Sequence, residues 1–407
     1  MSTGKRVRKM SNKNIPKIRF KEFINNWNNY KLGQLGTFKS GIGFSDSQQG
    51  GTEGIPFFKV SDMNNIGNET EMRNANNYVT QEQIMKNSWK VINETPAIIF
   101  AKVGAALMLN RKRLVTRPFL IDNNTMSYSF DESWDIDFGL TLFQTINLPK
   151  YAQIGALPSY NASDIAMIKV NVPDVQEQSA IGSLFRTIDG LLASYKDNLA
   201  NYQSLKATML SKMFPKAGQT VPEIRLAGFE GEWEAKILSR VTNITMGQSP
   251  KSENYTDNPN DYILVQGNAD IKNKQVVPRL WTTEVTKMAE IGDIILTVRA
   301  PVGDIGKTNY NVVIGRGVAA IKGNDFIFYT LEKMKMTGFW NRFSTGSTFD
   351  SISSNDIKEA IIQIPTLKEQ QAIGAYFSNL DNLISAHQEK IFQLETLKKK
   401  LLQDMFI

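Results

Sequence analysis

Residues 172–214 read VPDVQEQSAIGSLFRTIDGLLASYKDNLANYQSLKATMLSKMF, and residues 364–406 read IPTLKEQQAIGAYFSNLDNLISAHQEKIFQLETLKKKLLQDMF. A shift of 192 positions aligns the two stretches without a gap. Shared residues occur along the whole alignment: Pro173 with Pro365, Glu177–Gln178 with Glu369–Gln370, Ala180–Gly182 with Ala372–Gly374, Phe185 with Phe377, Asp189 with Asp381, Leu205–Lys206 with Leu397–Lys398 and Met213–Phe214 with Met405–Phe406. The chain therefore contains an internal repeat.

Each copy of the repeat has the hydrophobic period of a long α-helix. Mostly apolar residues recur at the spacing of seven that is typical of helices packed along their length. We predict a helix pair whose interface consists of Ile181, Leu184, Ile188, Leu191, Tyr195, Tyr202, Leu205, Met209, Ile373, Tyr376, Leu380, Leu383, His387, Leu394, Leu397 and Leu401. At about 1.5 Å per residue, roughly 35 helical residues form a rod about 50 Å long, which can serve as a spacer.

The composition of the 407 residues is that of an ordinary globular protein, with 41% hydrophobic and 21% charged residues. No apolar run reaches the roughly 20 residues needed to cross a bilayer, and the basic start lacks the apolar core of a signal peptide. The absence of cysteine excludes disulfides and thiolate metal sites, and fits a cytoplasmic protein. The single histidine, His387, stands in the predicted helix interface, which favours a packing role over a catalytic one. The net charge of +7 suggests a polyanionic partner.

A second repeat precedes each helix. The opening IPKIRFKEFINNWNNYKL at 15–32 matches VPEIRLAGFEGEWEAKIL at 221–238, keeping the Pro, Ile-Arg, Phe, Trp and Leu positions. We therefore divide the chain into a basic tail expected to be disordered, a first domain, a first helix, a second domain and a second helix, at 1–14, 15–171, 172–214, 215–363 and 364–407. Met10 begins MSNKNIPKIRF and is an alternative natural start.

The two domains are predicted to be mixed α/β, with irregular sheets. Short β-branched runs lie between Gly, Asn and Asp turns, which indicates strands, and two longer amphipathic stretches indicate helices. We expect strands near 55–60, 97–103, 262–266, 293–298 and 311–314, and helices near 137–145 and 326–337. The second domain leaves the end of the first helix and returns to the start of the second. Since domain termini usually lie close together, the two helices should run antiparallel as a coiled coil.

Several catalytic motifs fail on inspection. Residues 301–308 (PVGDIGKT) resemble a phosphate-binding loop, but Pro301 stands where glycine is required and a strand rather than a helix is expected to follow. No dinucleotide fingerprint follows a strand, and neither the motif of amino-methyltransferases nor that of metal-dependent nucleases of the Pro-Asp type is present. These failures disfavour a self-contained nuclease or methyltransferase.

Two diverged domains, each followed by a near-repeated long helix, resemble the DNA-specificity subunit of type I restriction-modification systems. The likeness covers nearly the whole chain, and its most specific parts are the Glu-Gln-x-Ala-Ile-Gly helices and the Pro-x-Ile-Arg openings. The resemblance implies two target-recognition domains, each reading one half of a bipartite, asymmetric double-stranded DNA site in the major groove. It also implies that the helices set the gap between the half-sites.

The resemblance further implies partners that carry the chemistry. The helices would dock two methyltransferase subunits, which bind S-adenosylmethionine and methylate adenines. Separate restriction subunits, driven by ATP and Mg, would translocate and cut DNA. This chain itself would be non-catalytic, with no cofactor and no metal. The alternative is a non-catalytic scaffold with two interaction domains and no DNA binding.

DNA binding requires cations for phosphates, and Arg, Lys, Asn or Gln for base edges. In the first domain the candidates are Lys59, Lys102, Arg111, Lys112 and Arg113. In the second domain they are Lys251, Gln266, Arg299, Lys307, Arg316, Ser347 and Thr348. Lys102 and Arg299 end apolar strands before a Val-Gly pair, which favours them over the others.

Overall fold

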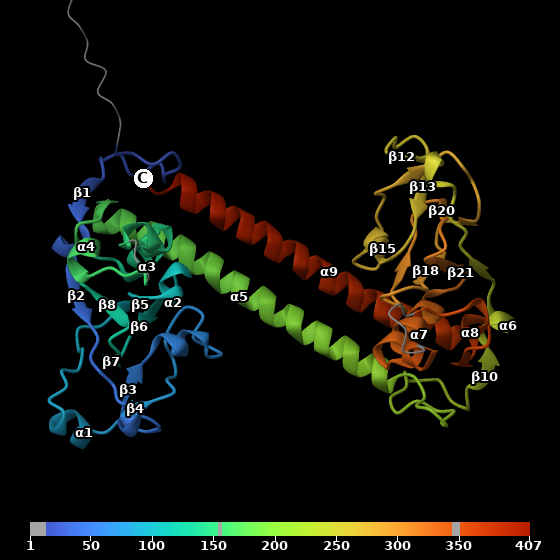
Figure 1. Cartoon of the computed structure of the whole chain (residues 1–407), viewed down its shortest axis with the longest axis horizontal. Helices are drawn as coiled ribbons and strands as arrows, with labels where there is room; N and C mark the ends of the chain where they lie inside the picture. Colours follow the sequence, from blue (N-terminus) through green and yellow to red (C-terminus); the bar gives the residue numbers. More distant parts are fainter. Residues whose placement is uncertain (1–13, 154–156, 344–350) are drawn as a thin grey trace, which may run out of the picture. The chain divides into compact units, whose positions relative to one another are not determined.

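The computed structural model of the chain describes residues 14–153, 157–343 and 351–407, so most of the basic tail and the candidates Ser347 and Thr348 lie outside it. The chain forms two compact units, Met1–Tyr195 with Lys390–Ile407, and Lys196–Glu389. Each unit holds one mixed α/β domain and about half of each long helix, α5 (Val175–Lys212) and α9 (Leu367–Asp404) (Figure 1). The expected fold class and both long helices are confirmed.

The first domain is built on three small sheets. Their strand orders are β1-β9, β2-β8-β5-β6 and β4-β3-β7. The pair β3·β7 is parallel, whereas the other strand pairs of this domain are antiparallel. The strands are β1 (Asn28–Lys31), β2 (Gly36–Ser40), β3 (Ile55–Phe58), β4 (Tyr78–Val79), β5 (Ala97–Ala101), β6 (Lys112–Val115), β7 (Leu120–Ile121), β8 (Thr125–Phe130) and β9 (Lys169–Val172).

The second domain repeats this frame with longer sheets. Its strand orders are β10-β22, β11-β21-β18-β19-β15-β14 and β12-β16-β13-β20-β17, and β13·β20 is again a parallel pair. The strands are β10 (Glu234–Ile237), β11 (Ile244–Met246), β12 (Tyr255–Thr256), β13 (Tyr262–Val265), β14 (Ile271–Lys272), β15 (Gln275–Val276), β16 (Trp281–Thr282), β17 (Met288–Ala289), β18 (Ile294–Thr297), β19 (Ile305–Lys307), β20 (Val312–Ile314), β21 (Val318–Ile321) and β22 (Ile361–Ile364).

One longer helix in each domain packs against the start of a long helix. The Asp135 side chain caps α3 by accepting the Phe138 N–H at 2.9 Å, and Asn324 caps α7 by accepting the Ile327 N–H at 3.1 Å. These two helices lie where the hydrophobic pattern predicts them. Apart from α5 and α9, the α-helices of the described residues are α1 (Gln81–Lys86), α2 (Ala105–Met108), α3 (Ile136–Thr145), α4 (Ala162–Ala166), α6 (Leu238–Val241), α7 (Asp325–Met336) and α8 (Ser354–Lys358).

The long helices run antiparallel within each unit (Figure 1). In the first unit the Phe185 ring lies 5.9 Å from that of Phe406, and Asp189 pairs with Lys398 at 2.6 Å. As the number on α5 rises, the number of its partner on α9 falls. In the second unit the Tyr202 ring lies 5.2 Å from His387, and Lys206 pairs with Asp381 at 2.5 Å, which gives the same direction.

The predicted interface residues are not equally buried. Ile181, Ile188, Ile373, Leu380 and Leu394 are buried, and the two Tyr of α5, Leu184, Met209, Tyr376, His387 and Leu401 are half-buried. Four leucines of the seven-residue repeat, however, keep 37–45% of their surface exposed. They are Leu191, Leu205, Leu383 and Leu397. A straight helix with 3.6 residues per turn drifts from a strict seven-residue repeat. This drift turns the four leucines outward and brings Leu192 and Leu210 inward.

Candidate nucleic-acid interface

The repeated openings fold onto the starts of the long helices through a buried ion pair. The Arg19 guanidinium donates to both carboxylate oxygens of Glu177, at 2.6 and 2.7 Å, and the Trp27 indole N–H donates to the same carboxylate at 3.2 Å. In the second unit Arg225 donates to both oxygens of Glu369 at 2.8 Å. Both carboxylates are almost fully buried, so each requires a cationic hydrogen-bond partner. This ion pair explains why an Ile-Arg opening and a Glu-Gln helix start occur together in both halves of the chain.

The last aromatic residue of each helix closes the core of its unit. Phe406, at the end of α9, packs on Trp27 and Phe138 in the first unit. Phe214, at the end of α5, packs on Trp233 and Phe326 in the second. Each domain is therefore completed by the end of the helix that follows the other domain, and the repeat is circular.

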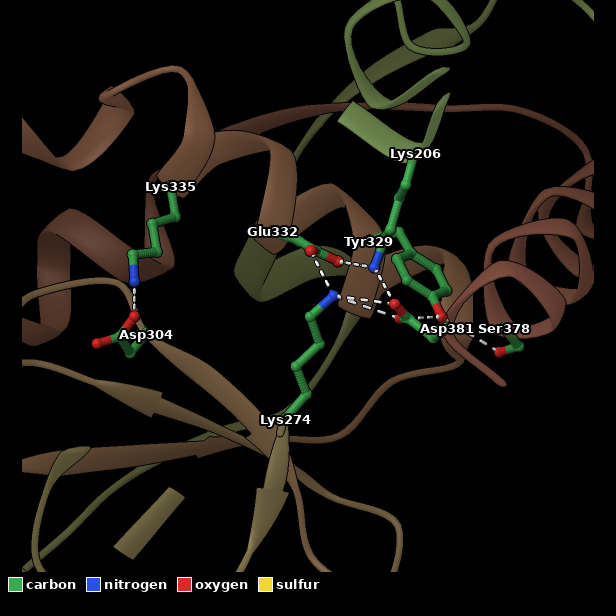
Figure 2. Close-up of polar contacts among 8 residues, drawn as sticks. All are labelled: Lys206, Lys274, Asp304, Tyr329, Glu332, Lys335, Ser378 and Asp381. Atoms are coloured by element: carbon green, nitrogen blue, oxygen red, sulfur yellow. Dashed lines mark hydrogen bonds and ion pairs between the residues drawn. The ribbon is translucent and has the colours of Figure 1, made fainter. Parts of the chain in front are cut away.

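A cavity of about 820 Å³ in the second unit lies between the domain and the helix pair. Lys206 pairs with Glu332 at 3.0 Å and with Asp381 at 2.5 Å. Lys274 pairs with the same two carboxylates, and the Tyr329 hydroxyl donates to Asp381 at 2.9 Å (Figure 2).

Burial lowers the pKa of Lys206 while Glu332 opposes that effect, and burial raises the pKa of Tyr329. The nearby Lys335 forms an ion pair with Asp304 (Figure 2). Because the lysines around this cavity have carboxylate partners, the cluster fixes the domain to its helix ends and offers little free charge to a polyanion.

The first-domain candidates face different surroundings. Lys59 follows β3 and donates through Nζ to Gln49 Oε1 at 3.0 Å, and Arg111 contacts Asn64. The Lys102 backbone N–H donates to the Asn124 carbonyl at 2.9 Å, which holds the residue at the end of β5.

Lys112 turns inward, where its ammonium donates to the Asn110 amide oxygen at 2.9 Å and the Ile146 carbonyl at 2.5 Å. Burial lowers the pKa of Lys112 to about 8. Burial, and the charge of Arg111, lower the pKa of Arg113, whose Nε is buried without a described acceptor. Arg111, Lys112 and Arg113 all line a cavity of about 500 Å³ beside α5 and α9 in the first unit.

The second-domain candidates separate into paired and unpaired groups. Lys307 ends β19 and forms an ion pair with Asp325, and a strand follows it at β20 rather than a helix. The backbone of Arg299, two residues beyond the end of β18, bridges to Ser351. Lys251 and Arg316 lie together at one hollow, described below, and Gln266 lies against Gly315 beside it.

Lys59 and Gln266 occupy equivalent positions in the two domains. Each directly follows the first strand of the parallel pair, β3·β7 or β13·β20, and each N–H donates to a buried aspartate, Asp62 or Asp270. Position 298 rather than Arg299 corresponds to Lys102, because the N–H groups of Val298 and Lys102 donate to the equivalent carbonyls of Gly317 and Asn124. The frames therefore match while the side chains presented from them differ.

Comparison with known proteins agrees with this architecture. A family model described as "Type I restriction modification DNA specificity domain" matches residues 24–201 and 230–396. The chain belongs to this family. The two matches cover both domains and most of both long helices.

Two relatives are named as specificity subunits of type I restriction enzymes. A Methanocaldococcus jannaschii protein named as the MjaX specificity subunit of a type I restriction enzyme is 29% identical over 273 residues, 64% of each chain. The MjaVIII specificity subunit from the same organism is 20% identical over 268 residues, 60% of this chain and 63% of that one. The chain thus matches just under two thirds of the length of these relatives.

Two solved chains share the fold. The S subunit of a type I restriction-modification system from M. genitalium is 14% identical, with a TM-score of 0.64 over 97% of this chain and 99% of that one. A chain from a structure on complex assembly and conformational transition of the type I R-M system is 21% identical, with a TM-score of 0.54 over 92% and 96%. In the described ranges, no helix is long and apolar enough to span a membrane. No group of three or more metal-ligating side chains occurs among those same residues.

Proposed function

We propose that this chain is the DNA-specificity subunit of a type I restriction-modification complex. The observation that carries the proposal is the family match over both domains, joined to a fold in which two similar frames present different side chains. Each domain would bind one half of a bipartite, asymmetric duplex target in the major groove. The helix pair would set the gap between the halves.

The proposal assigns the chemistry to partner subunits. Two methyltransferase subunits would dock on the long helices and bind S-adenosylmethionine, and restriction subunits would use ATP and Mg. This chain would contribute recognition alone, in the cytoplasm where the complex meets DNA.

A binding titration tests the proposal against a scaffold that binds no DNA. Mixed-sequence duplex DNA is titrated with the full chain at increasing salt, and fluorescence anisotropy reports the affinity. A DNA reader loses affinity linearly on a log–log plot, because bound phosphates release counterions. A scaffold would show no salt-dependent affinity, and that result would refute the proposal.

A further inference from the structure

The second domain carries an open hollow of about 560 Å³ whose charged lining is entirely basic. It is lined by Met246, Gly247, Gln248, Ser249, Pro250, Lys251, Lys287 and Arg316. Three cations and no carboxylate line this hollow. The cavity at Lys206 has instead both lysines and carboxylates in its lining.

Hydrogen bonds hold three separate chain segments around the hollow. The Gln248 N–H donates to the Ile314 carbonyl at 2.9 Å, and the Arg316 N–H donates to the Ser249 hydroxyl at 3.1 Å. The Ile314 N–H donates in turn to the Lys287 carbonyl at 2.8 Å, and Thr286 donates to the Gln248 carbonyl. The Lys251 N–H donates to the Glu284 carboxylate at 2.8 Å. The backbone that carries the three cations is therefore fixed before any ligand binds.

Glycine allows these segments to approach so closely. A Cβ atom on Gly247 would lie 2.1 Å from the Gly315 carbonyl oxygen, and one on Gly317 would lie 2.0 Å from the Gln266 carbonyl oxygen. Neither backbone oxygen can move away cheaply. Glycine at 247 and 317 is thus required by the packing of the hollow.

Two of the three cations of the hollow, Lys287 and Arg316, lack among the described residues the carboxylate partners that other lysines of this unit possess. The exposed side chains of Lys287 and Arg316 make no hydrogen bond or ion pair within the described part of the chain. Lys251 approaches Glu253 only at 3.8 Å, and both side chains are more than 70% exposed, so that pair is weak. Beside the hollow, the Gln266 amide nitrogen is buried without a described acceptor. Two unpaired cations and one weakly paired cation on a fixed backbone suit the negative charge of a phosphate group.

The first domain has the same frame at this place without the charge. The Ile42 N–H donates to the Ile121 carbonyl at 2.9 Å, as the Gln248 N–H does to Ile314. Ile42 and Phe44, however, pack in an apolar cluster with Phe57, and Asp122 stands where the second domain has Gly315. Of these two equivalent places, only the one in the second domain is a basic hollow.

We propose that Lys251, Lys287 and Arg316 bind a phosphodiester group of duplex DNA in this hollow. The proposal rests on the proposed function and deepens it, because it assigns backbone anchoring of the second half-site to three named side chains. Lys287 is absent from the sequence-based candidates. Lys287 is far along the chain from Lys251 and Arg316, so the sequence does not indicate that the three lie together. The fold around β13 and β20 brings them to one hollow.

The test compares two triple variants of the full chain with equal charge change. One carries Lys251→Ala, Lys287→Ala and Arg316→Ala. The control carries Lys216→Ala, Lys236→Ala and Lys322→Ala, three lysines of the same unit whose side chains are 41–59% exposed and that each have a carboxylate partner. Mixed-sequence duplex DNA is titrated at several salt concentrations, and thermal melting verifies that each variant is folded.

The slope of log affinity against log salt separates the outcomes. Since each lost phosphate contact changes the slope by about 0.9, loss of the single phosphate held in the hollow should lower the slope by about 1 unit, while the control keeps the wild-type value. Equal slopes in the hollow variant and the wild type, or equal losses in both triples, overturn the hollow as the phosphate site and leave the proposed function standing. A wild-type chain without salt-dependent DNA affinity overturns both.

Discussion

Replacing Glu177 with alanine removes the carboxylate that joins the first opening repeat to the first long helix. The Arg19 guanidinium would keep only its bond to the Asn25 carbonyl, and the Trp27 indole N–H would lose its acceptor. The Glu177 side chain is fully buried and that of Arg19 is 10% exposed, so water cannot readily replace the lost partner.

The magnitude follows from the cost of breaking a buried ion pair. Removing one partner of such a pair costs about 3–5 kcal/mol, because the remaining charge stays buried. For a unit of about 200 residues, each kcal/mol lowers Tm by about 2–4 °C. We therefore expect Glu177→Ala to lower the Tm of the first unit by about 6–20 °C.

The second unit supplies a matched control in Glu369→Ala. Arg225 would keep bonds to the carbonyls of Gly231 and Glu230, and the Trp233 indole N–H has no described acceptor to lose. A hydrogen bond to a charged group contributes about 1.5–3 kcal/mol. The loss for Glu369→Ala should be smaller than that for Glu177→Ala by about this amount.

Differential scanning calorimetry of the full chain measures both variants, with Glu177→Gln as an intermediate that keeps an acceptor for Trp27. The expected order of Tm is wild type, then Glu177→Gln, then Glu177→Ala, with Glu369→Ala above Glu177→Ala. A Tm loss below about 2 °C in both alanine variants, or a larger loss in Glu369→Ala, would refute the argument that these ion pairs fasten the openings to the helices.

Three further changes test other parts of the structure. Lys112→Gln removes a base whose pKa falls from 10.5 to about 8 on folding, so the unfolded chain binds more protons between those values. The free energy of unfolding of the wild type, relative to that of the variant, should then rise from pH 8 to pH 10.5 by at most about 3 kcal/mol. Urea unfolding of both proteins at both pH values measures this difference in free energy, and a difference that does not change with pH would contradict the prediction. Lys206→Met leaves two carboxylates to Lys274 alone and should destabilise by about 3 kcal/mol, whereas the repeat-equivalent Lys398→Met breaks a more exposed pair and should cost about 1 kcal/mol. The reverse order in urea unfolding would argue against the cluster as a fastening. If the helix pair sets the gap, inserting one helical turn into both long helices should widen the gap in the methylated site by about one to two base pairs, and an unchanged gap would argue against the spacer.

The long helices and the fold class were predictable because they depend on local signals. The seven-residue period and the gapless repeat predict the positions of α5 and α9. The path of the chain through the second domain predicts that the two helices run antiparallel. The outward rotation of Leu191 and its three counterparts was not predictable at this level. It depends on the geometry of straight helices rather than on residue type.

The candidate site was harder to predict because charge does not state direction. Arg111, Lys112 and Arg113 form the densest basic run in the first domain, yet all three line a cavity beside the helices, where the Lys112 ammonium donates to the Ile146 carbonyl. Lys307 stands next to a glycine but is taken up by Asp325. Whether a cation is paired is decided by residues far away in the chain, which a single sequence does not bring together.

Mapping of methylated adenines tests the central claim most directly, that two unlike domains read two halves of one target. The chain is expressed with its methyltransferase partner in a host that lacks other adenine methylation, and again with residues 221–363 replaced by the second domain of another family member. We predict a bipartite, asymmetric motif with a fixed gap, of which only one half changes in the exchanged chain. An uninterrupted motif, a palindrome, or a change in both halves would contradict the account.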